Sequence, residues 1–388
     1  MKNPKIRFKG YTDDWEQHKL SDIAEFLDTM RKPLEGSKRV SGSYPYYGAS
    51  GIVDYVEGYI FDEELVLLSE DGANITDRNY PVCFLASGKF WVNNHVHVLK
   101  IKLGNENNFV CNSLERKDYN QYNTGMAMPK LNQEVCRDIP VSCPSYEEQK
   151  KIGDYFRNLD NLISLHQRKC EDTKTLKKYM LQKMFPQNGM NVPEIRFDGF
   201  TEAWEQRKWI DVVDISTEMV NPTTGEYDNM PHIAPGNIES FTGRILDNVK
   251  TVKEEQLISG KFRFRPDDVV YGKINPQLGK YFYATVNGLT SADAYVFNGK
   301  NGLKQKFLFA LLQTSDFFKY SVSVSKRSGM PKINRDELNA YSFLMPSDEE
   351  QDKIGSYLLQ LDNFITLHQQ KCNELQNIKK CMLQNMFV

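Results

Sequence analysis

The chain has 388 residues, of which 40% are hydrophobic and 12% aromatic, and its formal net charge is −2. These values describe a folded chain long enough for two or three domains, and they exclude a largely disordered protein. No apolar run of about 18 residues occurs, so we expect a cytoplasmic protein without a membrane anchor. Seven cysteines without C-x-x-C spacing fit reduced thiols better than disulfides or a zinc site. Any nucleic-acid binding has to come from a local basic face.

The chain contains a second copy of its own frame. Residues 4–19 return at 193–208, an offset of 189. Residues 144–185 return at 346–387, an offset of 202, with 25 of 42 positions identical. The segments between these blocks look unrelated. A repeat this long is a duplication of whole modules, and constant frames around changed inserts indicate a device that reads two different things at a set separation.

The first insert is predicted to be β-rich, with strands over 64–70, 80–86 and 90–101. Aromatic and small residues fill the preceding segment, YPYYGASGI at 44–52. Its tyrosines, Tyr46 and Tyr47 among them, either lie along a DNA groove or pack a hairpin.

The only His-x-His pair, His95 with His97, falls on the last of these predicted strands. Alternate residues of a strand share one face, which is compatible with zinc. Zinc sites need three or four ligands, however, and no further His or Cys lies at ligand spacing. We therefore expect strand packing and no metal, with Asn93 and Asn94 as candidate DNA contacts.

The repeated block after each insert predicts one long helix. Each helix opens on a Ser-x-x-Glu capping box, at Ser145 and at Ser347. No proline follows within the predicted helices 146–184 and 348–386. Each helix would be roughly 58 Å long at about 1.5 Å per residue.

The second insert predicts the same kind of module, with strands over 268–274, 280–286 and 292–298 and a helix over about 305–320. Both inserts end on a similar sequence motif, TGMAMPKLN at 124–132 and KRSGMPKIN at 326–334. We interpret the two inserts as one fold with diverged surfaces.

The loop before each long helix is a candidate for DNA contact. In the second insert its polar and basic residues are Lys326, Arg327, Ser328, Lys332 and Arg335. A basic loop that contains glycine suits phosphate binding and base contact by Arg or Lys. The alternative is a solvated charged turn, which Asp336 and Glu337 support in part. The matching residue of the first insert is Lys130, with Tyr122 just upstream.

Apolar residues recur along both helices in alternating steps of four and three, the spacing of a coiled-coil seam. We assign to this helix–helix seam Ile152, Phe156, Leu159, Ile163, His166, Ile354, Leu358, Leu361, Ile365 and His368. Because the two histidines take seam positions, we interpret them as setting register and not as catalytic.

Connectivity predicts that the two helices are antiparallel. Only eight residues, 186–193, link the first helix to the second module. An antiparallel pair brings both attachment points of that module to one end, whereas a parallel pair would make it span about 58 Å. The expected α+β fold is two β-rich modules joined by two long antiparallel coiled-coil helices with pseudo-two-fold symmetry. His166 should then lie near His368.

This organisation resembles the specificity (S) subunit of type I restriction–modification systems. The resemblance rests on two variable modules, near-identical long helices and a similar loop before each helix, and it covers essentially the whole chain. The segments 44–52, 68–74, 87–99 and 267–297 also resemble phrases common in the target recognition domains of that family. One departure is Met126-Ala127, where the second loop has Ser328-Gly329.

The resemblance implies a DNA-reading subunit without catalytic activity, whose two target recognition domains each read half of a bipartite target in double-stranded DNA. Its helices would act as a spacer and dock two methyltransferase (M) subunits that bind S-adenosylmethionine. Separate restriction (R) subunits would use ATP with Mg, so we expect no cofactor on this chain. The corresponding segments are recognition domain 1 at 1–143, the first spacer helix at 144–186, recognition domain 2 at 187–345 and the second spacer helix at 346–388.

The candidate DNA-binding residues are the polar, basic and aromatic residues of these loops, turns and strands. They are Tyr46, Tyr47, Arg78, Lys89, Asn93, Asn94, Tyr122, Lys130, Lys273, Asn275, Lys326, Arg327, Ser328 and Lys332. Asn suits adenine and Arg or Lys suits guanine, but the residue types do not assign residues to bases.

Two other functions compete with this interpretation. A single-chain DNA methyltransferase needs a catalytic N/D-P-P-Y/F turn, but Asn221-Pro222 continues as Thr-Thr and Asn275-Pro276 as Gln-Leu. The phosphate-binding motif of ATPases is also absent. A bare E-x-K nuclease pattern at 148–150 lies in a helix cap without a partner strand. A purely structural coiled-coil adaptor is the second alternative, but it would not need diverged basic loops.

Overall fold

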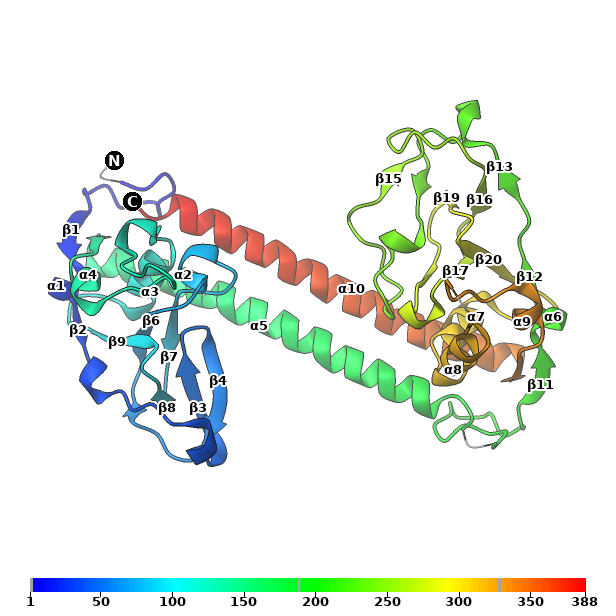
Figure 1. Ribbon diagram of the computed structural model, residues 1–388, viewed down its shortest axis with the longest axis horizontal. Helices are drawn as coiled ribbons and strands as arrows, with labels where there is room; N and C mark the ends of the chain where they lie inside the picture. Colours follow the sequence, from blue (N-terminus) through cyan, green and yellow to red (C-terminus); the bar gives the residue numbers. More distant parts are fainter. Residues whose placement is uncertain (1–2, 188, 327–328) are drawn as a thin grey trace. The chain divides into compact units, whose positions relative to one another are not determined.

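The computed structural model divides into two compact units (Figure 1). Unit 1 comprises Met1–Leu165 and Lys371–Val388, and unit 2 comprises His166–Gln370. Each unit therefore holds one β-rich module, called module 1 and module 2 below, and part of each long helix. None of the helices in the described residues is long and apolar enough to cross a membrane. The residues that the structure describes are 3–187, 189–326 and 329–388.

The described part of unit 1 has three sheets, with strand orders β1-β10, β2-β9-β6-β7 and β4-β3-β8-β5. Its strands are β1 (Glu16–Lys19), β2 (Ala24–Phe26), β3 (Ser41–Gly48), β4 (Gly51–Val56), β5 (Phe61–Asp62), β6 (Leu65–Ser69), β7 (Cys83–Ala86), β8 (Lys89–Val92), β9 (Val96–Ile101) and β10 (Pro140–Cys143). Its short α-helices are α1 (Leu20–Ile23), α2 (Asn74–Asp77), α3 (Asn107–Glu115) and α4 (Gln133–Arg137).

The described part of unit 2 also has three sheets, with strand orders β11-β21, β12-β20-β17-β18 and β13-β16-β19-β14-β15. Its strands are β11 (Glu205–Lys208), β12 (Val213–Ile215), β13 (Met219–Val220), β14 (Pro231–His232), β15 (Lys250–Thr251), β16 (Lys261–Phe264), β17 (Val269–Gly272), β18 (Tyr281–Tyr283), β19 (Gly288–Thr290), β20 (Ala294–Gly299) and β21 (Ser342–Met345). Its short α-helices are α6 (Trp209–Val212), α7 (Gln305–Leu312), α8 (Ser315–Val324) and α9 (Arg335–Asn339).

The two modules share one topology. The order β2-β9-β6-β7 recurs as β12-β20-β17-β18, and β4-β3-β8-β5 recurs as β15-β14-β19-β16, with β13 added at the edge. The parallel pairing also recurs, between β3 and β8 and between β14 and β19. The interpretation of the inserts as one fold with diverged surfaces is therefore confirmed.

Two 38-residue helices form the frame, α5 (Tyr146–Lys183) and α10 (Asp348–Asn385). Both end one residue earlier than predicted. The glutamate of each predicted capping box has a different partner. Glu148 accepts hydrogen bonds of 2.7 and 2.8 Å from Arg7, and Glu350 accepts the same pair from Arg196. These ion pairs join the repeated first segment of each module to the start of its long helix.

Within each unit the two long helices run antiparallel, as predicted (Figure 1). In unit 1, Lys379 Nζ lies 2.6 Å from Asp160 Oδ1. In unit 2, Lys177 forms the corresponding ion pair with Asp362. The two ion pairs are equivalent in the repeat, because the offset of 202 residues relates Asp160 to Asp362 and Lys177 to Lys379. The acid comes from α5 in unit 1 and from α10 in unit 2.

The C-terminal end of each helix is anchored in a module by aromatic packing. In unit 1 the rings of Trp15 and Phe387 are 6.4 Å apart, and in unit 2 those of Trp204 and Phe185 are 5.8 Å apart. Phe185 lies just after α5 and packs in module 2, whereas Phe387 lies just after α10 and packs in module 1. This exchange is the physical cause of the antiparallel arrangement within each unit.

The predicted seam residues serve two contacts. Seven of them are buried: Ile152, Phe156, Leu159, Ile163, Ile354, Leu358 and Leu361. They belong to the hydrophobic cores of the modules as well as facing the other helix. His166, Ile365 and His368 are half-buried.

One predicted strand and one predicted helix are each interrupted in the structure, and in both cases a single side chain forms the break. The expected strand over 90–101 is β8 and β9, because the side-chain oxygen of Asn93 accepts a hydrogen bond from the His95 N–H at 2.8 Å and forms a turn. His95 therefore lies outside the strand that holds His97. The expected helix over 305–320 is α7 and α8, because Thr314 caps the start of α8.

Candidate nucleic-acid interface

In both modules the loop before the long helix pairs with the end of a core strand. Lys130 forms an antiparallel bridge with Asp71 just after β6, and Lys332 forms one with Ile274 just after β17. Because β6 and β17 are equivalent strands, the two loops occupy equivalent edges of their modules.

A side chain from the neighbouring strand holds each loop. Nε2 of His97 on β9 lies 2.7 Å from the carbonyl oxygen of Leu131. The hydroxyl of Tyr295 on β20 donates to the carbonyl oxygen of Ile333 at 3.3 Å. We call the polar residues around His97 centre 1, namely Asp28, Arg31, Glu70, Asp71, His95, His97, Lys130 and Gln133. Centre 2, around Tyr295, comprises Lys273, Asp293, Tyr295, Lys332 and Arg335.

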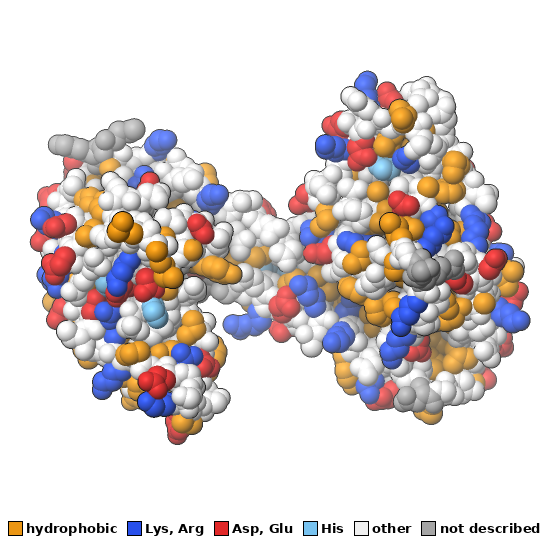
Figure 2. Space-filling view, viewed as in Figure 1, with side chains coloured by type: hydrophobic (Ala, Val, Ile, Leu, Met, Phe, Trp, Pro, Cys, Tyr) orange, Lys and Arg blue, Asp and Glu red, His pale blue; other side chains and the backbone are white. Residues whose placement is uncertain are grey.

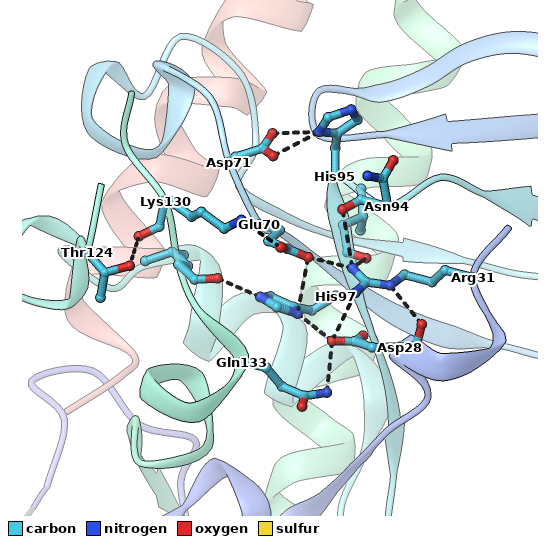
Figure 3. A network of polar contacts seen from close by, with 12 residues as sticks. Asp28, Arg31, Glu70, Asp71, Asn94, His95, His97, Thr124, Lys130 and Gln133 are labelled. Atoms are coloured by element: carbon cyan, nitrogen blue, oxygen red, sulfur yellow. Dashed lines mark hydrogen bonds and ion pairs between the residues drawn. The ribbon is translucent and has the colours of Figure 1, made fainter. Parts of the chain in front are cut away.

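The charges of centre 1 are paired with one another (Figure 3). Arg31 Nη1 lies 2.6 Å from Glu70 Oε2, and Lys130 Nζ lies 3.4 Å from Glu70 Oε1. His97 Nδ1 lies 2.6 Å from Asp28 Oδ2. Burial opposes the charge on His97, but the interactions with Asp28 and Cys136 together outweigh it and raise the pKa of His97 to about 10. The buried imidazole is therefore protonated at neutral pH.

His95 lies at the rim of centre 1. Its Nδ1 is 2.9 and 2.8 Å from the two carboxylate oxygens of Asp71, and its side chain is 50% exposed. Figure 3 shows its second ring nitrogen pointing away from the network. Among the described residues, no three His, Cys, Asp or Glu side chains are grouped so that they could hold a metal ion.

Centre 2 consists mainly of cations around an aromatic ring. Lys273 Nζ lies 5.1 Å from the ring centroid of Tyr295, and the Arg335 guanidinium lies 5.8 Å from it. Arg335 also donates to the carbonyl oxygens of Ile215 and Ser216 at 3.2 and 3.1 Å. Burial lowers the pKa of Lys273, and the neighbouring charges of Lys332 and Arg335 lower it further.

Several candidate residues of module 1 have structural roles. Tyr46 is only 1% exposed, and its hydroxyl accepts a hydrogen bond from the Leu34 N–H at 2.9 Å. Tyr47 stacks on Phe84 with ring centroids 5.8 Å apart. The hairpin-packing alternative therefore describes this segment. Tyr46 cannot contact DNA from the core, and we remove it from the candidate interface.

Arg78 and Asn93 also have hydrogen-bond or ion-pair partners within module 1. Arg78 pairs with Glu115 at 3.0 Å, and Asn93 is buried and forms the turn described above. Tyr122 packs edge-on against Tyr119 with ring centroids 6.3 Å apart. Four candidates of module 1 remain exposed, namely Arg78, Lys89, Asn94 and Lys130.

In module 2, Lys326 and Lys332 are exposed and Lys273 is half-buried. Asn275 takes a left-handed backbone with φ of 49°, and its N–H donates to the Pro331 carbonyl at 2.8 Å. Its role in the structure is to shape the turn. The predictions for Arg327 and Ser328 lie outside the described residues.

Sequence reasoning missed the acidic half of centre 1. Asp28 and Arg31 lie about 40 residues before Glu70, so no local motif joins them. Only the strand register shows that Glu70 and Lys273 are equivalent. The loop offset of 202 matches Ile333 to Leu131 but maps His97 onto Gly299, so this alignment gave no signal for Tyr295.

Comparison with known proteins agrees with this duplicated architecture. The model of the type I restriction modification DNA specificity domain matches residues 12–173 and 201–377. The specificity subunit of the type I restriction enzyme EcoDI from Escherichia coli is 25% identical over 392 residues, covering 94% of this chain and 85% of that protein. The MjaVIII specificity subunit from Methanocaldococcus jannaschii is 22% identical over 393 residues, covering 95% and 91%.

A solved structure shares the fold. The S subunit of a type I restriction–modification system from M. genitalium has a TM-score of 0.75 and 11% identity, over 100% of this chain and 99% of that one. The family domain occurs twice in the present chain, once for each module, and the two matches together cover most of its length. The chain therefore belongs to the family of type I restriction–modification DNA specificity subunits.

Proposed function

We propose that this chain reads a bipartite target in double-stranded DNA, with one half-site for each module. The observation that carries the proposal is that one topology and one helix frame present different side chains at equivalent edges. Membership of a DNA specificity family supports DNA as the partner. The contacts we propose are the exposed or half-buried cations of these loops and edges, namely Lys130, Lys273, Lys326 and Lys332, together with Asn94 next to centre 1 and Lys89 on β8.

Figure 2 shows basic and acidic side chains on the visible faces of both units. Lys and Arg side chains gather in several groups on the visible face of unit 2. On the visible face of unit 1, basic side chains lie beside acidic ones. Phosphate contacts position such a reader on DNA, and contacts to base edges supply its specificity.

We propose further that the helix frame holds two methyltransferase subunits. Unit 2 has a cavity of about 740 Å³ and unit 1 one of about 860 Å³, each against the long helices. Helix residues at equivalent repeat positions line both cavities: Lys177, Lys178 and Leu181 in one, and Lys379, Lys380 and Leu383 in the other. Two copies of the methyltransferase subunit could therefore bind the two equivalent surfaces of the helices.

In this proposal the chemistry belongs to the partners. The methyltransferase subunits would bind S-adenosylmethionine, and restriction subunits would use ATP and Mg. The present chain would contribute neither a cofactor nor a catalytic group, and it would work in the cytoplasm, where the cell's DNA is. The purified single chain should accordingly transfer no methyl group from S-adenosylmethionine to DNA.

The test of DNA reading is methylation mapping of genomic DNA from cells that express the methyltransferase subunit with and without this chain. We expect one bipartite motif that depends on the chain. Replacing residues 20–143 by the corresponding insert of another specificity subunit should change one half of that motif and leave the other half unchanged. A motif that survives without the chain would reject the proposal.

The test of partner docking is subunit stoichiometry, measured by light scattering of the purified complex. Lys178 and Lys380 are equivalent and both exposed, so neither substitution should disturb a core. Lys178→Glu and Lys380→Glu should each remove one methyltransferase subunit, and the double variant should remove both. Full stoichiometry in the double variant would place docking elsewhere.

A further inference from the structure

Backbone hydrogen bonds make Glu70 of module 1 and Lys273 of module 2 equivalent. The N–H of Glu70 donates to the His95 carbonyl and that of Lys273 to the Asp293 carbonyl, both at 2.9 Å. The Glu70 carbonyl accepts from Leu131 at 2.7 Å, and the Lys273 carbonyl accepts from Ile333 at 3.1 Å. The same place beside the same loop is therefore anionic in one module and cationic in the other.

In module 1 this carboxylate neutralises the edge. Glu70 contacts Arg31 at 2.6 Å, Lys130 at 3.4 Å and His97 at 3.9 Å. Asp28 and Glu70 are paired with Arg31, Lys130 and His97, and Asp71 is paired with His95. Lys130 projects from the loop, but its charge already has a partner.

In module 2 the corresponding edge is not neutralised. Among the residues that the structure describes, no carboxylate is within ion-pair distance of Lys273 or Lys332. Of the acids nearby, Asp293 is the only one in centre 2, and Glu337 accepts a hydrogen bond from the Asn334 N–H at 2.8 Å in the cap of α9. Centre 2 therefore holds three cations, Lys273, Lys332 and Arg335, against one carboxylate, Asp293, whose charge only partly offsets the burial that lowers the pKa of Lys273.

We infer that Lys273 and Lys332, together with Arg335, form a binding site for a DNA phosphate in module 2. The equivalent edge of module 1 lacks such a site, because the Glu70 carboxylate is paired with the cations Arg31 and Lys130 there. This inference rests on the proposed function and deepens it. The two half-sites are then held by different means, and the salt dependence of DNA binding arises mainly from module 2.

Salt dependence gives a quantitative test, because each neutralised phosphate contributes about 0.9 to the slope of log K against log salt concentration. The probe is a labelled duplex carrying the mapped bipartite motif, titrated with the assembled complex over about 50 to 200 mM salt. Lys332→Gln and Lys130→Gln are a matched pair, because the two lysines occupy the same repeat position.

We expect Lys332→Gln to lower the slope by about one unit, and Lys273→Gln with Lys332→Gln to lower it by up to about two. Lys130→Gln should leave the slope unchanged, because the charge of Lys130 is already paired with Glu70 and its proposed DNA contact is to a base edge and not to a phosphate. Glu70→Gln should steepen it by up to about one unit, because it frees the charge of Lys130. Circular dichroism and subunit stoichiometry check that each variant is folded and assembled.

Equal slope changes for Lys130→Gln and Lys332→Gln would overturn the inference, as would an unchanged slope for the double lysine variant. In either case the unchanged complex still binds its motif specifically, so the proposed function stands. Absence of motif-specific binding by the unchanged complex would instead reject the proposed function and this inference with it.

Discussion

His166 and His368 face each other in unit 2, with their Nδ1 atoms 2.9 Å apart. They are the same residue of the repeat, separated by the offset of 202, so the contact joins a position to its own copy. A hydrogen bond between the two nitrogens needs one Nδ1–H and one free lone pair, whereas two charged rings would have a hydrogen on both nitrogens and would repel each other. The pair therefore couples the contact between the long helices to pH.

The first prediction is a loss of stability in mild acid. Burial, and then the charges of His166 and Lys169, lower the pKa of His368. A lowered pKa in the folded state means that the unfolded chain takes up the proton first. The stability contribution is thus present above the unfolded pKa of about 6.5 and is lost as pH falls below it.

Thermal unfolding of the chain between pH 8 and pH 5 measures this loss. The control is the variant with His166→Gln and His368→Gln, which can keep a hydrogen bond and cannot take up a proton in this range. The melting temperature should fall more steeply with acid in the unchanged chain than in the control. Parallel pH profiles would contradict the prediction.

The second prediction compares the two equivalent ion pairs of the frame. The side chains of Lys177 and Asp362 are 8% and 13% exposed, whereas those of Lys379 and Asp160 are 25% and 45% exposed. Removing one partner of a buried pair leaves an uncompensated charge and costs about 3 kcal/mol, whereas an exposed pair contributes less than about 1 kcal/mol. Lys177→Ala should therefore destabilise unit 2 by more than Lys379→Ala destabilises unit 1.

Hydrogen exchange along α5 and α10 separates the two effects, because the exchange rates of the backbone amides in each unit measure the local unfolding of that unit. Faster exchange in the unit 2 part of the helices for Lys177→Ala, with little change in unit 1 for Lys379→Ala, is the expected result. Equal effects would show that burial does not distinguish the pairs.

A third prediction concerns Tyr46, which the sequence suggested as a DNA contact. Since its hydroxyl binds the Leu34 N–H inside the module, Tyr46→Phe should lower the free energy of unfolding by about 1 kcal/mol. DNA affinity and the recognised motif should stay the same at a temperature where the variant is folded. A changed motif with unchanged stability would restore Tyr46 to the interface.

The fourth prediction concerns the helices as a spacer. One heptad inserted after Lys174 and one after Gln376 keeps the steps of four and three in phase and lengthens each helix by about 10 Å. The gap between the two half-sites should then increase while both half-site sequences stay the same. Methylation mapping measures both, and altered half-sites at an unaltered gap would show that the helices do not set the spacing.

The sequence by itself determined the frame of this protein. Helix periodicity is a local property of the sequence. The repeat at an offset of 202 residues, which relates Ile152 to Ile354 and His166 to His368, is found by comparing the sequence with itself. The eight-residue linker was enough to predict the antiparallel direction. The aromatic contacts of Phe185 and Phe387 supply its physical cause.

Only the tertiary structure decided the chemistry of the two edges. The alternation of residues along the strand does not show whether the Tyr46 side chain points into the core or toward solvent. The Asn93 side chain ends a strand that β propensity alone predicts to continue. The pairing of Asp28 with His97 and of Glu70 with Arg31 joins residues that lie far apart in the chain. Strand register brings such residues together, and register depends on the packing of the whole module. For this reason the charge exchange between Glu70 and Lys273 could be found only in the folded protein.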